Sequence, residues 1–325
     1  MNISLASFIS YIKENGDDNG DKDYSFSVLT PYTDVFEICK AVDTVYRPEQ
    51  VRDFIFDAND RNAVLITHRI YDMNGFIKKN LNYSQAWALL MGIPFTDTDG
   101  GTKVCSVLDD NRFNMSKTAD NVLKEVKEKG YDDFVIMQFS GGQSPLIQVP
   151  KGQRQREDGT VEEFADWSKV AYNYENEPLK RHYPLDKARK FVELFQEEHP
   201  TTAVILYQLP NEPYAFDKTF KYTIPYIAYY ELAKKPECRG TVSIDSSLQH
   251  LVAGVNKSVV VWAHSLPDNF GYSYNKNIIQ DCRRNDILYF SELGPSGAAV
   301  RYIEPDKLLA EVDGYLFVGK KEEEK

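Results

Sequence analysis

Asp245, Ser246 and Ser247 are the residues of this sequence whose types and spacing best suit chemistry on an anionic ligand. They follow a run rich in β-branched residues, 241–244, and they precede an apolar segment, 248–255, that is typical of a helix. The first N–H groups of a helix have no partner within it, and they lie at the positive end of its dipole. A strand that leads into such a helix start therefore predicts a phosphate site.

The segment after this helix completes a βαβ unit. Residues 258–263 read SVVVWA, and a strand this apolar is expected inside a parallel sheet, where both of its faces are covered. A second apolar strand, 134–139, ends in the turn Ser140-Gly141-Gly142. The strands and the helix between them predict an α/β fold.

Residues 245–250 resemble the D-[ST]-[GS]-x-x-H segment of glycosyltransferase family 9, the ADP-heptose:lipopolysaccharide heptosyltransferases and their relatives. The strand 134–139 and its turn resemble the start of that family's C-terminal domain. Residues 181–184, Arg-His-Tyr-Pro, resemble its K-x-[WY]-P step, and 206–212 resemble its strand, loop and Glu. The similarity spans roughly residues 30 to 263.

The resemblance implies two Rossmann-like domains that face a cleft, the GT-B type of fold. It also implies transfer of a sugar from a nucleotide-sugar donor to a hydroxyl of a glycan or another acceptor, with inversion and with no metal or cofactor. The donor-binding residues that it implies are Ser140, Gly141, Arg181, Glu212, Asp245, Ser246, Ser247 and His250.

The phosphate contacts fall on four of these residues. Ser246, Ser247 and their N–H groups are expected to hold the departing diphosphate, and Arg181 is expected to add a bidentate contact where the family has Lys. His250 lies one helical turn further on and is expected to face the same phosphate. Alternatively, Arg181 lies on a solvated helix start, and His250 is bonded within the domain interface.

The hydroxyl contacts fall on two carboxylates. Asp245 is expected to accept hydrogen bonds from the sugar, and Glu212 from the ribose. Either residue could instead cap a neighbouring turn.

The general base is unassigned. The resemblance places it between the first strand and first helix of the N-terminal domain, but residues 5–13 match that first helix. The sequence therefore predicts an N-terminal domain without its first strand and a chain with little or no transfer activity. A strand at 314–319 is a candidate replacement, and Asp72 and Asp97 are candidate substitute bases. The competing hypothesis is a non-catalytic protein that binds nucleotide-sugar or glycan as an assembly component.

Three parts make up the expected domain organisation: an acceptor-side domain at 1–112, a donor-binding domain at 113–312, and a terminal segment with a charged tail at 313–325. The donor-binding domain carries a long charged insertion, 141–180, that lacks apolar periodicity. Such a segment is either a mobile loop or a lid over the acceptor. The aromatic residues that would serve a lid are Trp167, Tyr172 and Tyr174.

Apolar periodicity and capping residues predict the remaining elements. We expect helices at 5–13, 34–42, 48–57, 83–91 and 185–199, and strands at 25–29, 44–46 and 63–67.

Composition limits the function classes. A length of 325 residues favours two domains, and a net charge of −11 argues against nucleic-acid binding. No apolar run is long enough for a transmembrane segment and no signal peptide is evident, so we expect a cytoplasmic protein.

Asp97 and Asp99 mimic a metal-binding DxD but follow no strand, so we expect no metal. The four cysteines show no CxxC spacing and are expected to be buried thiols: Cys39, Cys105, Cys238 and Cys282.

Overall fold

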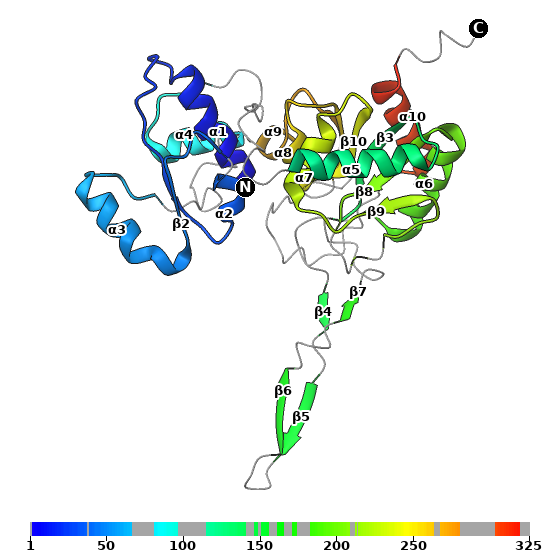
Figure 1. The fold of residues 1–325 in the computed structure, drawn as a ribbon, viewed down its shortest axis with the longest axis horizontal. Helices are drawn as coiled ribbons and strands as arrows, with labels where there is room; N and C mark the ends of the chain where they lie inside the picture. Colours follow the sequence, from blue (N-terminus) through cyan, green and yellow to red (C-terminus); the bar gives the residue numbers. More distant parts are fainter. Residues whose placement is uncertain are drawn as a thin grey trace, which may run out of the picture.

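The computed structural model of the protein describes residues 2–37, 39–66, 81–96, 115–140, 146–148, 151–155, 161–165, 171–173, 183–208, 212, 214–262, 267–279 and 303–318. Two regions of α/β structure lie side by side, and a narrow two-stranded arm extends away from them (Figure 1). In the part of the chain that is described, no helix has both the length and the apolar character needed to cross a membrane.

A six-stranded parallel sheet organises the C-terminal region, in the order β12-β11-β10-β3-β8-β9. Counted along the chain from β3, this is the order 6-5-4-1-2-3 of a doubly wound nucleotide-binding sheet. The strand order reverses between β3 and β10. The strands are β3 (Asp133–Gln138), β8 (Thr202–Leu206), β9 (Thr219–Lys221), β10 (Cys238–Ile244), β11 (Ser258–Trp262) and β12 (Lys276–Ile279).

Helices cover both faces of this sheet, and successive strand residues contact opposite layers. In β3, Val135 and Met137 pack with one layer, whereas Phe134 and Ile136 pack with the other. Burial on both faces explains why the inner strands β3, β8 and β11 are largely apolar. One layer holds α6 (Leu185–Glu198) and α10 (Pro305–Leu316); the other holds α5 (Met115–Glu128), α7 (Tyr226–Ala233) and α8 (Ser247–Val252).

The N-terminal region packs against α8. Phe8, Ile12 and Trp87 belong to the same buried cluster as Leu248 and Leu251, so the core is continuous between the two regions. A short parallel pair, β1 with β2, lies beside these helices. The elements are α1 (Asn2–Asn15), β1 (Ser27–Leu29), α2 (Thr33–Glu37), β2 (Thr44–Tyr46), η1 (Pro48–Gln50), α3 (Val51–Asp60) and α4 (Tyr83–Met91).

Helix α4 has the bounds that the sequence predicted, because both of its ends carry local signals. Asn82 Oδ1 accepts a hydrogen bond from the Gln85 N–H, and Gln85 Oε1 accepts one from the Asn82 N–H, which is a capping box. Gly92 ends the helix with a φ of 68°, a left-handed conformation that favours glycine.

Two predicted strands are wrong. Residues 63–66 form no strand, and Val64 is 82% exposed, because no neighbouring strand of the described chain pairs with them. Residues 314–316 belong to α10, whose buried Leu308, Val312 and Leu316 recur every four residues, the period of a helix. The replacement strand proposed at 314–319 is therefore excluded for these residues.

The other predictions of secondary structure hold with changes at their ends. The helix predicted at 34–42 ends at Glu37, and the one at 48–57 begins as η1 and continues as α3. Cys39 and Cys238 are buried free thiols, as expected, and burial raises the pKa of both.

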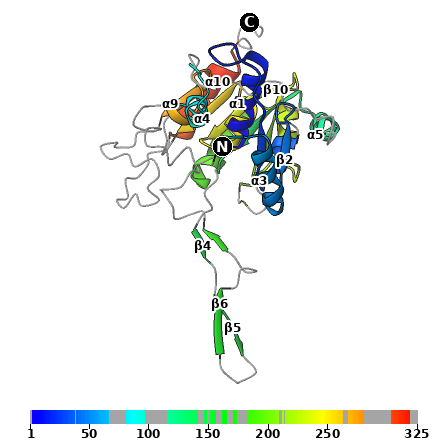
Figure 2. The same ribbon diagram turned by 90° about the vertical axis from the view of Figure 1, so that its left-hand side faces the viewer.

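The insertion, 141–180, contains regular structure where it is described, and both alternatives for it, the mobile loop and the lid, stay predictions. The strand β4 pairs with β7, and β5 pairs with β6, both antiparallel. The register of the second pair runs from Lys151 opposite Ala165 to Gln155 opposite Val161. Both views show β5 and β6 extending far from the body (Figures 1 and 2). The strands are β4 (Leu146–Gln148), β5 (Lys151–Gln155), β6 (Val161–Ala165) and β7 (Ala171–Asn173).

Candidate functional site

The candidate site lies at the carboxyl ends of β3 and β10, where the strand order reverses. The register pairs Gln138 with Ser243, and two residues further along each strand come Ser140 and Asp245. Both residues are buried, with exposed fractions of 6% and 5%. In doubly wound sheets the crevice at this reversal point binds ligands, so the fold brings these two predicted residues to the expected place.

A side chain from β3 caps the start of α8. Gln138 Oε1 accepts a hydrogen bond of 3.2 Å from the Leu248 N–H. The Leu248 N–H thus has no partner within α8, as expected, but it is bonded to a side chain from outside the helix. Ser246 occupies the N-cap position in an extended conformation, but its side chain makes no capping hydrogen bond. Because Gln138 supplies the cap, the Ser246 hydroxyl is not committed to stabilising α8.

Asp245 is fixed by contacts on two sides. Its N–H donates to the Val261 carbonyl at 3.2 Å, which ties the end of β10 to β11. Its Oδ1 accepts a hydrogen bond of 3.0 Å from Gln249 Nε2, one turn into α8. The carboxylate is therefore both buried and held in one orientation.

Ser247 is exposed and lies next to the end of β8. Its Oγ is 3.2 Å from the hydroxyl of Tyr207, whose ring packs edge-on against Tyr229 with centroids 4.8 Å apart. Burial raises the pKa of Tyr207, and the nearby charge of Glu212 raises it further. The Glu212 carbonyl accepts a hydrogen bond from Lys221 Nζ at 3.2 Å. The structure thus brings Ser247, Tyr207 and Glu212 to one edge of the sheet.

His250 lies where α8 meets the N-terminal region. Its Nδ1 is 3.0 Å from the Tyr272 hydroxyl, and its ring packs edge-on against Tyr83 of α4 at 5.3 Å. Nearby, Asn269 in α9 (Pro267–Phe270) donates to the Leu81 carbonyl at 2.9 Å. These contacts match the alternative in which His250 is bonded within the domain interface, and a phosphate contact by His250 stays a prediction.

Sequence reasoning missed three residues of this site: Gln138, Tyr207 and Gln249. A signal for Gln138 existed, because an amide at the end of an otherwise apolar, doubly covered strand needs a specific partner. The Ser140 Oγ is buried without a hydrogen-bond partner among the described residues. The predicted residues outside the described chain are Gly141, Arg181, Asp72, Asp97, Asp99, Trp167 and Tyr174.

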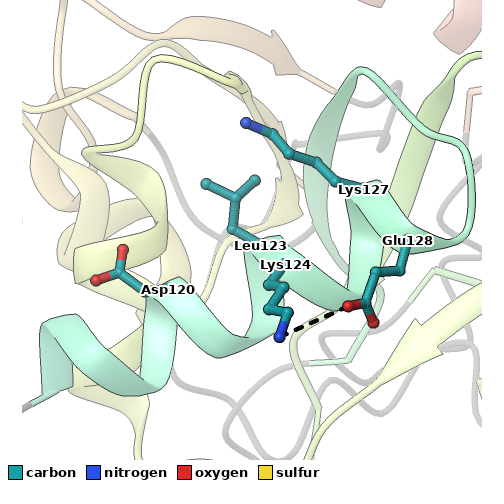
Figure 3. A pocket seen from close by; sticks show the side chains of 5 residues that line it. All are labelled: Asp120, Leu123, Lys124, Lys127 and Glu128. Atoms are coloured by element: carbon teal, nitrogen blue, oxygen red, sulfur yellow. Dashed lines mark ion pairs between the residues drawn. The ribbon is translucent and has the colours of Figure 1, made fainter.

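A separate surface hollow lies along α5, away from these strand ends. It has a volume of about 540 Å³ and is lined by Asp120, Leu123, Lys124, Lys127 and Glu128. Figure 3 shows Lys124 paired with Glu128, and Lys127 and Asp120 form further ion pairs with Glu237 and Lys235. Because one solvated helix lines it and its charges are paired, we assign it no ligand. Among the described residues, no cluster of His, Cys, Asp or Glu could hold a metal ion.

No protein-family model matches the sequence, and a comparison with curated proteins gave no significant match. Solved structures do match over nearly the whole chain. The glycosyltransferase family 9 protein from Veillonella parvula DSM 2008 matches with a TM-score of 0.56, 9% identity, and coverage of 98% of this chain and 95% of that one. The ADP-heptose lipopolysaccharide heptosyltransferase II of E. coli matches with a TM-score of 0.52, 11% identity, and coverage of 98% and 95%.

At these identities the likeness shows the fold. The predicted resemblance to glycosyltransferase family 9 and the GT-B type of α/β fold are thereby confirmed. The absence of a first strand in the N-terminal domain and the domain boundaries at 112 and 312 stay predictions.

Proposed function

We propose that this protein transfers a sugar from a nucleotide-sugar donor to an acceptor hydroxyl, with inversion and without a metal. The observation that carries the proposal is the buried Asp245, followed by Ser246 in the chain, on the strand next to the one that ends in Ser140, at the reversal point of a doubly wound sheet. The structural neighbours are a family 9 glycosyltransferase and a heptosyltransferase, which supports the same reaction type.

The reaction requires stabilisation of a leaving group. As the acceptor oxygen bonds to the anomeric carbon, the bond from that carbon to the diphosphate breaks and negative charge develops on the diphosphate. Hydroxyl and N–H donors placed there in advance lower the barrier. We assign this role to Ser140, Gly141, Ser246, Ser247 and Arg181.

Orientation of the donor requires hydrogen-bond acceptors. We assign Asp245 to hydroxyls of the sugar and Glu212, which lies beyond β8, to those of the ribose. We assign His250 to the interface with the N-terminal region and, as a second role, to a contact with the phosphate. The N-terminal region, which packs on α8 next to His250, then lies on the acceptor side. The acceptor proton must pass to a base, and we assign none.

Binding of a panel of nucleotide-sugars, screened by thermal shift and measured by calorimetry, tests the proposal. Asp245→Ala should weaken the binding of the best donor by about 1–3 kcal/mol, because a hydrogen bond to a charged group is lost. Asp217→Ala, at an exposed turn, is the matched control. Unchanged affinity in a folded Asp245→Ala protein would refute the assignment.

The second candidate is a non-catalytic protein that binds the donor or a glycan as an assembly component. It is favoured by the lack of an assigned base, since acid–base catalysis typically supplies about 10²–10⁴-fold. A radiolabelled transfer assay with a donor shown to bind, run over a range of acceptor glycans, separates the two. Binding without transfer supports this candidate, and turnover at several per second supports the enzyme.

A further inference from the structure

The contact between Asp245 and Gln249 is unusual because both side chains are buried. Gln249 is fully buried, with an exposed fraction of 0%, and Asp245 is 5% exposed. The Gln249 Nε2 donates to Asp245 Oδ1 at 3.0 Å. Pairs of Gln and Asp four residues apart also occur on solvated helices, where they contribute little. Here the pair lies inside the core.

The orientation of the Gln249 amide follows from chemistry. The amide presents its NH₂ group to Asp245, whose Oδ1 accepts the hydrogen bond. The amide oxygen then faces away, and Gln249 Oε1 has no hydrogen-bond partner among the described residues. A buried acceptor without a partner destabilises a folded protein.

An apolar residue would fit this position better on grounds of stability. The neighbouring Leu248 and Leu251 are both fully buried in the same cluster, so the surroundings of α8 are apolar. A polar residue that breaks a local rule without a structural gain points to a functional demand. The contact that Gln249 does make is the one to Asp245.

Gln249 completes the fixation of the Asp245 carboxylate. The main chain of Asp245 is already held by its hydrogen bond to Val261. The side chain retains two rotatable bonds, and anchoring Oδ1 sets the direction of both carboxylate oxygens. Groups held in advance by such supporting contacts bind a ligand without a loss of rotamer freedom at the moment of binding.

The geometry points to Gln249 as a positioning residue that aims the Asp245 carboxylate at the sugar of the donor. This inference rests on the proposed function. It assigns Gln249 to recognition of the sugar alone, because Asp245 is the group assigned to the sugar hydroxyls. The diphosphate and the nucleoside are assigned to other residues, so their binding should not depend on Gln249.

The experiment compares the affinity of two ligands, the nucleotide-sugar that binds best and the corresponding nucleoside diphosphate. Gln249→Met keeps the length of the side chain and removes the amide. We expect about a tenfold loss of affinity for the nucleotide-sugar and less than a twofold change for the nucleoside diphosphate. In an Asp245→Ala background, Gln249→Met should cause no further loss, because Gln249 acts through Asp245.

Two controls keep the result interpretable. Gln196→Met replaces a glutamine on α6 whose hydrogen bond to the Asp217 carbonyl is exposed, and it should leave both affinities unchanged. Gln249→Asn keeps an amide but withdraws it by one methylene, and it should reproduce the selective loss if Gln249→Met does not fold.

The outcomes separate the two proposals. Equal losses for both ligands, or a loss that persists without the Asp245 carboxylate, would show a purely structural role and overturn the inference. Unchanged affinities in the folded variants would overturn the inference and leave the proposed function intact. A wild-type protein that binds no nucleotide-sugar would overturn the proposed function and, with it, this inference.

Discussion

Replacing Gln138 with leucine tests whether β3 caps α8. In the wild type, Gln138 Oε1 accepts the hydrogen bond from the Leu248 N–H at 3.2 Å, and the two residues are 6% and 0% exposed. Gln138→Leu preserves the approximate size of the side chain and removes the acceptor. The Leu248 N–H then stays buried and unpaired, because Ser246 makes no capping bond that could replace it.

The expected loss follows from this single bond. A buried donor without a partner costs about 1–3 kcal/mol, and loss of a helix cap costs about 0.5–2 kcal/mol. Both figures describe the same bond, so they are not added, and we expect the free energy of unfolding to fall by about 2 kcal/mol. An unfolding entropy of about 2 cal/mol/K per residue over 325 residues corresponds to about 1.5 °C per kcal/mol, so the midpoint of thermal unfolding should fall by roughly 3 °C.

Urea unfolding measures the free energy, and hydrogen exchange locates the change. Exchange of the amides of α8 should accelerate in Gln138→Leu, while the amides of α6 on the other face keep their protection. Gln196→Leu is the control, because it removes an exposed amide and should change the stability by less than about 0.5 kcal/mol. Unchanged stability together with unchanged exchange in α8 would refute the assignment of Gln138 as the cap.

Three further predictions address packing, charge and the arm. Gly240→Ala should destabilise the protein by about 1–3 kcal/mol, because the added Cβ would lie 2.7 Å from the Lys257 carbonyl oxygen and the φ of 142° disfavours any residue but glycine. Gly314→Ala, with nothing within 4 Å of its added Cβ, should be neutral or stabilising in thermal melts. Lys127 holds the pKa of Glu237 below its ordinary value of 4.5. This pair therefore stabilises the fold above pH 4.5, and its contribution is lost as the pH falls below that value. Glu237→Gln should reduce the difference between the free energies of unfolding that urea titrations give at pH 6 and at pH 3. Limited trypsin digestion should cut first in the β5–β6 arm, because an isolated two-stranded hairpin is marginally stable, and cutting first in the helices of the sheet would contradict this.

The elements predicted well from sequence are those with signals close together in the chain. Helix α4 has its capping box and its glycine within eleven residues, Asn82 to Gly92, and its predicted bounds are confirmed. Strands β2, β3 and β11 needed only an apolar or β-branched run between turns. Residues 63–66 have the same β-branched composition and form no strand, because a strand also needs a neighbour to pair with, and composition says nothing about neighbours.

Assignment of 314–319 to a strand failed for a different reason. The short apolar run Tyr315-Leu316-Phe317-Val318 is compatible with a strand, but the helical spacing of the buried residues is visible only when the sequence is followed from Leu308 onwards. Comparison of the apolar spacing over the longer segment 305–316 would have identified the helix. At the candidate site, the contiguous Asp245–His250 segment was found from the sequence. Gln138, in contrast, lies 110 residues from Leu248, whose N–H it caps, and the two residues become neighbours only in the folded protein.

The cap from β3 also restricts how a diphosphate can bind at the proposed site. Gln138 occupies the N–H of Leu248, one of the donors that a phosphate at the start of α8 would use, and α8 spans only Ser247–Val252, so its dipole is short. A diphosphate there must either displace Gln138 or be held by other donors. The Ser246 hydroxyl, which makes no capping bond, and the Ser140 Oγ, which has no partner among the described residues, are such donors, and they come from both sides of the strand-order reversal. The cap thus favours a site in which side-chain hydroxyls, more than the helix dipole, hold the leaving group.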